Sequence, residues 1–92
     1  MMEFHGSHLK PLREGFVPIA WSEPVPRGGS IRVRAHTCEC ITPSYELCSA
    51  AGLVHIRRTV RSAEGICVRE SPWLRPAAAH RRWERLLDGP AR

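Results

Sequence analysis

The apolar residues of this 92-residue chain change their spacing near residue 72, and that change limits the folds the chain can adopt. In "SIRVRAHTCECI", Ile31, Val33 and Ala35 alternate with polar residues, as expected for a strand with one buried face. "SPWLRPAAAHRRWERLLDGP" instead repeats its apolar residues every three or four positions, which predicts an amphipathic helix. Strands followed by a single helix predict an α+β fold.

Turn residues divide the middle of the chain into further strands. "YELCSAAGLVHIRRTV" predicts a β-hairpin that turns around Ala50, Ala51 and Gly52, where glycine supplies a positive φ. "SAEG" predicts a second turn and "ICVRE" a further strand. Pro76 suits the first turn of the helix, and Gly89 followed by Pro90 ends it. We therefore predict a small antiparallel sheet of three to four strands, covered on one face by one C-terminal amphipathic helix.

Residues 1–30 have a different composition from the rest of the chain, with four of its eight prolines and four of its seven glycines. Proline fixes φ and removes a ladder donor, which disfavours regular helix or sheet. We predict an extended arm over residues 1–30 and a single sheet-plus-helix domain over residues 31–92. Phe16, Ile19 and Trp21 would pin the arm to the domain or, alternatively, bind a partner.

The charge of the chain raises the question of nucleic acid. The formal net charge is +5 and the basic excess lies in residues 45–92, which is compatible with a nucleic-acid surface. Almost every basic residue is arginine, however, and such a bias accompanies GC-rich codon usage. No apolar run approaches the roughly 20 residues that span a bilayer, and the N-terminus lacks the apolar region of a secretory signal. We expect a cytoplasmic protein.

The stretch "HTCECITPSYELC" is a candidate metal site. If the strand continues through it, His36, Cys38 and Cys40 point to one side of the sheet, with Cys48 and Cys67 on other strands. Such a set could hold Zn²⁺ tetrahedrally. Only one residue separates the close cysteine pair, whereas zinc ribbons place two residues between paired ligands on a tight turn. We predict core or semi-buried cysteines without metal or other cofactor, with a small zinc-binding module or a reversible disulfide as alternatives.

Catalytic motifs are not recognised in this sequence. Cys38 and His36 are close, but nucleophilic catalysis also needs an oriented third group and a cleft, for which so short a chain has little room. There is no glycine-rich phosphate loop and no carboxylate pair in an apolar setting. We therefore expect no enzyme and name no catalytic residue.

Four arginines on the hairpin and the last strand are candidates for DNA binding. They are Arg57, Arg58, Arg61 and Arg69. A three-stranded sheet with one helix behind it resembles, in its order of elements, the arm-binding domains of integrases. Such a domain places arginines in the major groove of DNA. The alternative is a solvated sheet face on which these arginines pair with Glu46, Glu64 and Glu70.

Two stretches of the C-terminal half, "CVRESPWL" and "HRRWERLLDGPAR", carry a resemblance to a known family. Over residues 45–92 the chain resembles small actinobacterial regulatory proteins, BldB-like and of unknown biochemistry. Their C-terminal half runs V-R-[DE]-S, a proline-containing linker, then a helix ending W-x-x-[FL]-L-x-G. The matching positions are Val68, Arg69, Glu70, Ser71, Pro72, Trp83, Leu86, Leu87 and Gly89. Some members are encoded beside XRE-type helix-turn-helix regulators.

The resemblance implies a regulatory accessory protein in transcriptional or developmental control, without catalysis, whose partner is a helix-turn-helix regulator or a second copy of itself. Interfaces favour tryptophan and arginine as anchors. "SPWLRPAAAHRRW" offers Trp73, Arg75, Arg81 and Arg82, which we predict to lie within reach of one another and to bind the partner. The competing interpretation is that these arginines only solubilise a closed monomer.

Overall fold

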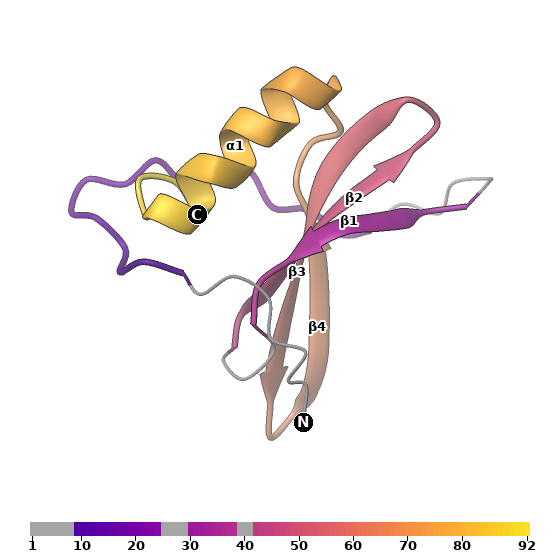
Figure 1. The fold of residues 1–92 in the computed structure, drawn as a ribbon. Coiled ribbons are helices and arrows are strands. Elements are labelled where there is room, and N and C mark those ends of the chain that lie inside the picture. The colour runs from indigo at the N-terminus through magenta and orange to yellow at the C-terminus, as the bar shows by residue number, and fades with distance from the viewer. Residues whose placement is uncertain (1–8, 25–29, 39–41) are drawn as a thin grey trace, which may run out of the picture.

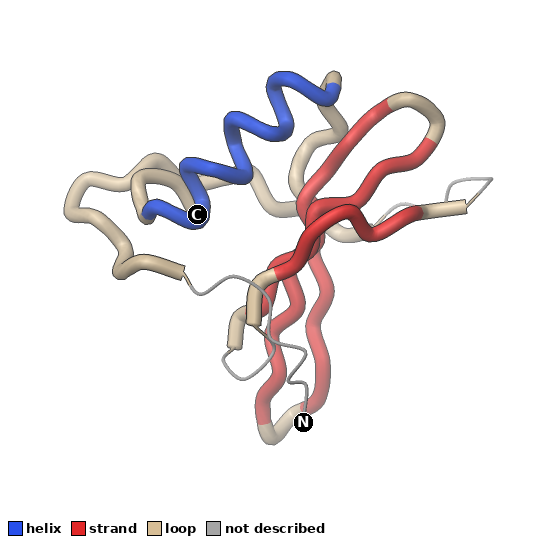
Figure 2. Tube along the Cα trace, in the orientation of Figure 1, coloured by secondary structure: helices blue, strands red, loops and turns tan. Residues whose placement is uncertain are grey.

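The computed structural model describes residues 9–24, 30–38 and 42–92 of the chain. They form four strands, β1 (Arg32–His36), β2 (Ser44–Ala50), β3 (Leu53–Ser62) and β4 (Gly65–Glu70), and one helix, α1 (Pro76–Asp88) (Figure 1). The strands make one antiparallel sheet in the order β1-β2-β3-β4. The helix lies across one end of this sheet, and the β3–β4 hairpin extends away from it (Figure 2). The predicted small α+β fold is confirmed.

The β2–β3 turn sets which side chains face the helix. Ala51 and Gly52 both have positive φ, 50° and 77°, as in the two-residue turns whose twist suits a hairpin. This turn places Leu47 opposite Ile56, and opposite residues share a face of the sheet. Both are almost completely buried in the main core, together with Tyr45, Val54, Ala79, Trp83 and Leu86.

The helix begins and ends where the sequence predicts. Pro76 is its first residue, and Ala79, Trp83 and Leu86 form its buried stripe. Gly89 ends it in the left-handed conformation with φ 99°, and its N–H donates to the Arg85 carbonyl at 3.0 Å. A side chain at this position would clash as well, because a Cβ on Gly89 would lie 2.3 Å from the Pro11 carbonyl oxygen.

Residues 9–24 pack against the end of α1 as an extended segment (Figure 1). The Lys10 N–H donates to the Leu87 carbonyl at 2.8 Å, and the Val17 N–H donates to the Pro90 carbonyl at 2.8 Å. Ile19 is buried in the core, whereas Phe16 remains 38% exposed. This part of the arm therefore completes the core of the domain.

Trp21 is the second anchor of the arm. Its indole N–H donates to the Arg92 carbonyl at 3.1 Å, and its ring lies 5.7 Å from that of Tyr45. One residue further, the backbone of Ser22 pairs with that of Glu70 at the edge of β4. Of the three apolar residues expected to pin the arm, Ile19 and Trp21 therefore do so.

Strand β1 differs from the predicted pattern. It ends at His36, and its pairing with β2 shifts between Val33 and Ala35, as at a β-bulge. Val33 is 46% exposed, while Ala35 packs against the core. β1 is an edge strand, and its arginines oppose pairing with a further strand. In the described residues, no helix combines the length and the apolar character needed to cross a membrane.

Candidate partner-binding site

A groove of about 220 Å³ lies between α1 and the N-terminal arm. One of its walls is a stripe of α1 whose members are spaced by three, one and three residues, so that they share one side of the helix. The stripe consists of Ala78, Arg81, Arg82 and Arg85. The opposite wall comes from the arm and the C-terminus, with Val17, Pro18, Ile19 and Ala91. We call this the arm–helix groove.

The arm–helix groove is basic, and one of its arginines has a buried hydrogen-bond donor. It is lined by three arginines and, within the described structure, by no acidic side chain. The Nη1 atom of Arg82 is buried, and no described residue accepts a hydrogen bond from it. A buried donor without an acceptor is costly, and a carboxylate is the acceptor that guanidinium matches best. Val17, 57% exposed, adds an apolar contact at the rim.

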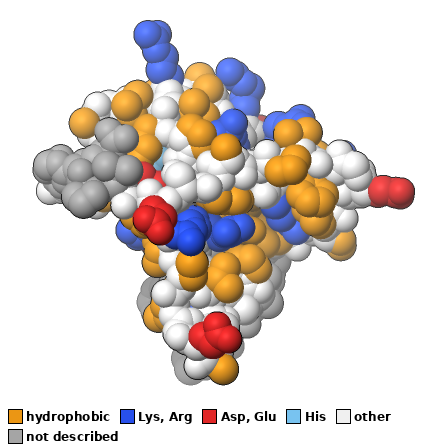
Figure 3. All heavy atoms as spheres, turned by 180° about the vertical axis from the view of Figure 1, so that it is seen from behind, with side chains coloured by type: hydrophobic (Ala, Val, Ile, Leu, Met, Phe, Trp, Pro, Cys, Tyr) orange, Lys and Arg blue, Asp and Glu red, His pale blue; other side chains and the backbone are white. Residues whose placement is uncertain are grey.

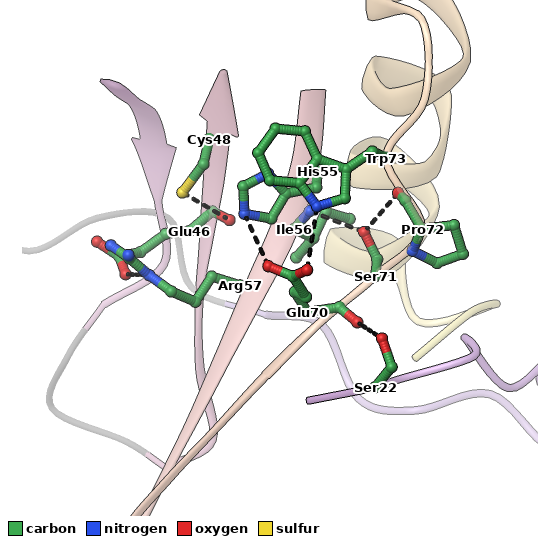
Figure 4. Close-up of polar contacts among 10 residues, drawn as sticks. All are labelled: Ser22, Glu46, Cys48, His55, Ile56, Arg57, Glu70, Ser71, Pro72 and Trp73. Carbon is green, nitrogen blue, oxygen red and sulfur yellow. Dashed lines mark hydrogen bonds and ion pairs between the residues drawn. The ribbon is translucent and has the colours of Figure 1, made fainter. Parts of the chain in front are cut away.

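Trp73 lies apart from this groove. Its ring stacks on that of His55, with centroids 4.0 Å apart, and its indole N–H donates to the Glu70 Oε1 at 3.1 Å (Figure 4). His55 lies between Val54 and Ile56 in β3, and those two side chains face the helix. Because neighbours in a strand point to opposite faces, His55 and the Trp73 ring stacked on it lie on the other face of the sheet.

Of the four predicted partner-binding residues, the structure brings only Arg81 and Arg82 together in this groove. Arg75 is exposed at the N-cap of α1 and does not line the groove. Trp73 contributes to the packing of the fold, so the four residues do not line one common groove.

The buried polar cluster beneath Trp73 was not predicted. The His55 Nε2 lies 3.7 Å from the Glu70 Oε2, and both side chains are almost fully buried. Beside them the Ser71 hydroxyl accepts the Ile56 N–H at 2.8 Å and donates to the Pro72 carbonyl at 3.2 Å (Figure 4). A histidine inside the apolar run of β3 was the available signal, because a buried imidazole needs a polar partner.

The four arginines proposed for DNA binding divide between the two faces of the sheet. Arg57 and Arg58 are adjacent in β3 and therefore point to opposite faces. Arg57 pairs with Glu46, Nε to Oε1 at 2.8 Å, on the face away from the helix. Arg61 lies four residues after Arg57 in β3, on the same face, and donates to the Ser44 hydroxyl at 3.2 Å.

Arg58 and Arg69 lie opposite each other on the other face. The Arg58 guanidinium lies 5.0 Å from the centre of the Trp21 ring, and the Arg69 Nη1 lies 3.5 Å from the Glu23 Oε1. Both arginines therefore contact side chains of the arm. The four do not form a single exposed basic face, and Figure 3 shows basic side chains spread over the surface among hydrophobic ones.

The cysteines and His36 are not arranged as predicted for a shared strand. Because β1 ends at His36, that residue is exposed while Cys38 is completely buried. Cys48 is buried in β2 and Cys67 is exposed on β4. Cys40 lies outside the described residues. In the part of the chain that the structure describes, no three potential ligands are grouped as a metal site.

The thiol of Cys48 is buried in the sheet. Burial raises its pKa to about 11, an effect that Arg57 opposes and the carboxylates of Glu46 and Glu70 reinforce. At neutral pH this side chain is therefore protonated and packs as an apolar group.

No protein family, curated protein or solved structure matches this chain. The residues that carry the resemblance to BldB-like proteins nevertheless hold defined structural positions. Glu70 and Ser71 belong to the buried polar cluster. Trp83 and Leu86 form the helix stripe in the core, and Gly89 is the C-cap against the arm.

Proposed function

We propose that this chain is a small, non-enzymatic regulatory accessory protein that acts by binding another protein in the arm–helix groove. The observation that carries the proposal is the set of three arginines, Arg81, Arg82 and Arg85, which line one wall of the groove with no acidic side chain among its described lining residues. Arginine is a preferred anchor of protein interfaces, above all where a carboxylate of the partner meets it in a desolvated pocket.

The groove favours a partner segment that carries one or more carboxylates beside a small apolar side chain. The carboxylate would pair with Arg82, and the apolar side chain would contact Val17 at the rim. A second copy is a poorer occupant, because each chain carries a net charge of +5 and two basic grooves repel each other. The resemblance to BldB-like proteins supports a helix-turn-helix regulator of an actinomycete as this partner, with transcriptional or developmental control as the process.

The test compares two charge-matched double variants. Tagged protein captures its partner from the cytoplasm of the source cell, and the recovered partner is titrated against each variant. We expect Arg81→Glu with Arg82→Glu to weaken binding by about 100-fold, because it places like charges opposite the partner's carboxylates. Arg32→Glu with Arg34→Glu removes the same charge elsewhere and serves as the control, with thermal melts to verify that both variants are folded.

Two results would contradict the proposal. One is a chain that remains monomeric and retrieves no partner. The other is equal weakening by the two double variants, because net charge rather than the groove would then drive association.

A further inference from the structure

A second and larger groove, of about 500 Å³, lies on the helix side of the sheet. It is formed by the start of β1, the β2–β3 turn and the first turn of α1. Its polar lining includes Arg32, Arg34, Ser49 and His80, and its apolar lining includes Leu53 and Pro76. None of these residues lines the arm–helix groove. We call it the β1 groove.

The pairing of β1 with β2 explains why two arginines meet there. Arg32 lies directly opposite Ser49, and the Arg34 Nε donates to the Ser49 hydroxyl at 2.9 Å. This contact holds the Arg34 side chain over β2 and leaves its two terminal nitrogens available. In the described ranges, no acidic side chain forms an ion pair with either arginine. The arginines therefore present guanidinium donors that the fold does not use.

The opposite wall of the β1 groove adds no negative charge. His80 lies one turn into α1, beyond Pro76, and the first turn of the helix contains no acidic residue. The volume is within the range of sites for small organic ligands. Leu53 and Pro76 offer an apolar surface of the kind on which a ring can rest.

We propose that the β1 groove binds a small phosphomonoester of about mononucleotide size. Two guanidinium groups and the Ser49 hydroxyl suit the three oxygens of a phosphate dianion better than a single carboxylate. The phosphate lies between Arg32 and Arg34, and the organic part extends over Leu53 toward Pro76. This ligand is independent of the partner protein proposed for the arm–helix groove.

The experiment follows amide chemical shifts of the full ¹⁵N-labelled chain during titration at physiological ionic strength. The probes are inorganic phosphate, ribose 5-phosphate, AMP and adenosine. We expect saturable shifts near Ser49, Gly52 and His80, strongest for AMP and weakest for inorganic phosphate, and none for adenosine. If ribose 5-phosphate equals AMP, the same site takes sugar phosphates, and if AMP is stronger, the base contributes to binding.

Two variants decide whether the groove is responsible. Arg32→Gln with Arg34→Gln is expected to weaken AMP binding at least about tenfold, equivalent to about 1.4 kcal/mol. Arg81→Gln with Arg82→Gln loses the same charge in the other groove and is expected to leave the affinity within about twofold, because charge in that groove adds only screened attraction. If the first variant is unfolded by circular dichroism, Arg32→Gln alone replaces it, since no described side chain depends on Arg32.

The proposal is overturned by any of three outcomes. Binding that does not saturate by about 10 mM AMP would be too weak for a built site. Equal weakening by the two double variants would show general charge attraction. Adenosine that binds as well as AMP would show that the phosphate is not recognised.

Discussion

The two faces of the sheet are closed by different chemistry. Toward the helix, apolar side chains such as Ile56 pack against Trp83. On the opposite face, Trp73 is held over His55 by ring stacking and by a hydrogen bond to Glu70. Apolar burial is non-directional and scales with area, whereas a buried polar cluster depends on the position of each atom. The helix face therefore supplies most of the stability, while the polar face positions the linker between β4 and α1.

The largest expected effect tests the helix face. Trp83→Ala removes the aromatic side chain at the centre of the α1 stripe, which is 7% exposed. Truncating a buried aromatic residue typically costs about 3 to 5 kcal/mol. A small domain has a total stability of about 5 to 15 kcal/mol. We expect the urea midpoint to fall steeply, or the variant to be unfolded in buffer.

The matched change on the polar face is Trp73→Phe. It keeps an aromatic ring at this position but removes the indole N–H that Glu70 accepts and part of the ring area that stacks on His55. Losing the hydrogen bond of a buried polar group costs about 1 to 3 kcal/mol. If Trp73→Phe lowered the urea midpoint as much as Trp83→Ala, the assignment of stability mainly to the helix face would be wrong.

The helix face was predictable from the sequence because its features are local. The spacing of Ala79, Trp83 and Leu86 gives the buried stripe, and Pro76 and Gly89 give its ends. The opposite directions of Arg57 and Arg58 were equally readable, because neighbours in a strand point to opposite faces. The prediction of one surface with all four arginines did not take this alternation into account.

The polar face was not predictable because its contacts join distant parts of the chain. His55 meets Glu70 and Trp73 only after the β3–β4 hairpin and the linker have folded. The arm–helix groove has the same origin, since Val17 and Arg82 are far apart in the sequence. No strand-breaking residue marks the end of β1 at His36. The alternation of apolar and polar residues therefore predicted a strand that continues beyond this residue.

A further prediction tests the polar face through Cys48, which lies opposite His55. Burial raises the pKa of its thiol from 9.0 to about 11. The unfolded thiol loses its proton near pH 9 while the folded thiol keeps it, so stability is lost as pH rises from about 9 to 11. This difference in pKa corresponds to a loss on the order of 3 kcal/mol.

Urea unfolding of the wild type and of Cys48→Ala across this pH range measures the effect. Both proteins share the titration of their other groups, so the difference between them isolates Cys48. We expect the advantage of the wild type over Cys48→Ala to shrink between pH 9 and 11. Parallel profiles would mean that the thiol is not shielded on this face.

The smallest expected effect concerns the β2–β3 turn, which belongs to neither face. Ala51 has φ 50° and is exposed, and left-handed backbone costs a residue with a Cβ about 1 to 2 kcal/mol. Ala51→Asn creates an Asn-Gly pair with Gly52, the favoured sequence for this turn, and we expect a gain of about 0.5 to 1 kcal/mol in urea unfolding. Gly52→Ala is the matched control: a Cβ there meets no atom within 4 Å, so any loss of stability comes from the backbone alone.

Because the turn touches neither tryptophan, the gain from Ala51→Asn should add to the loss in Trp73→Phe. A gain that disappears in that background would instead couple the hairpin turn to the polar face.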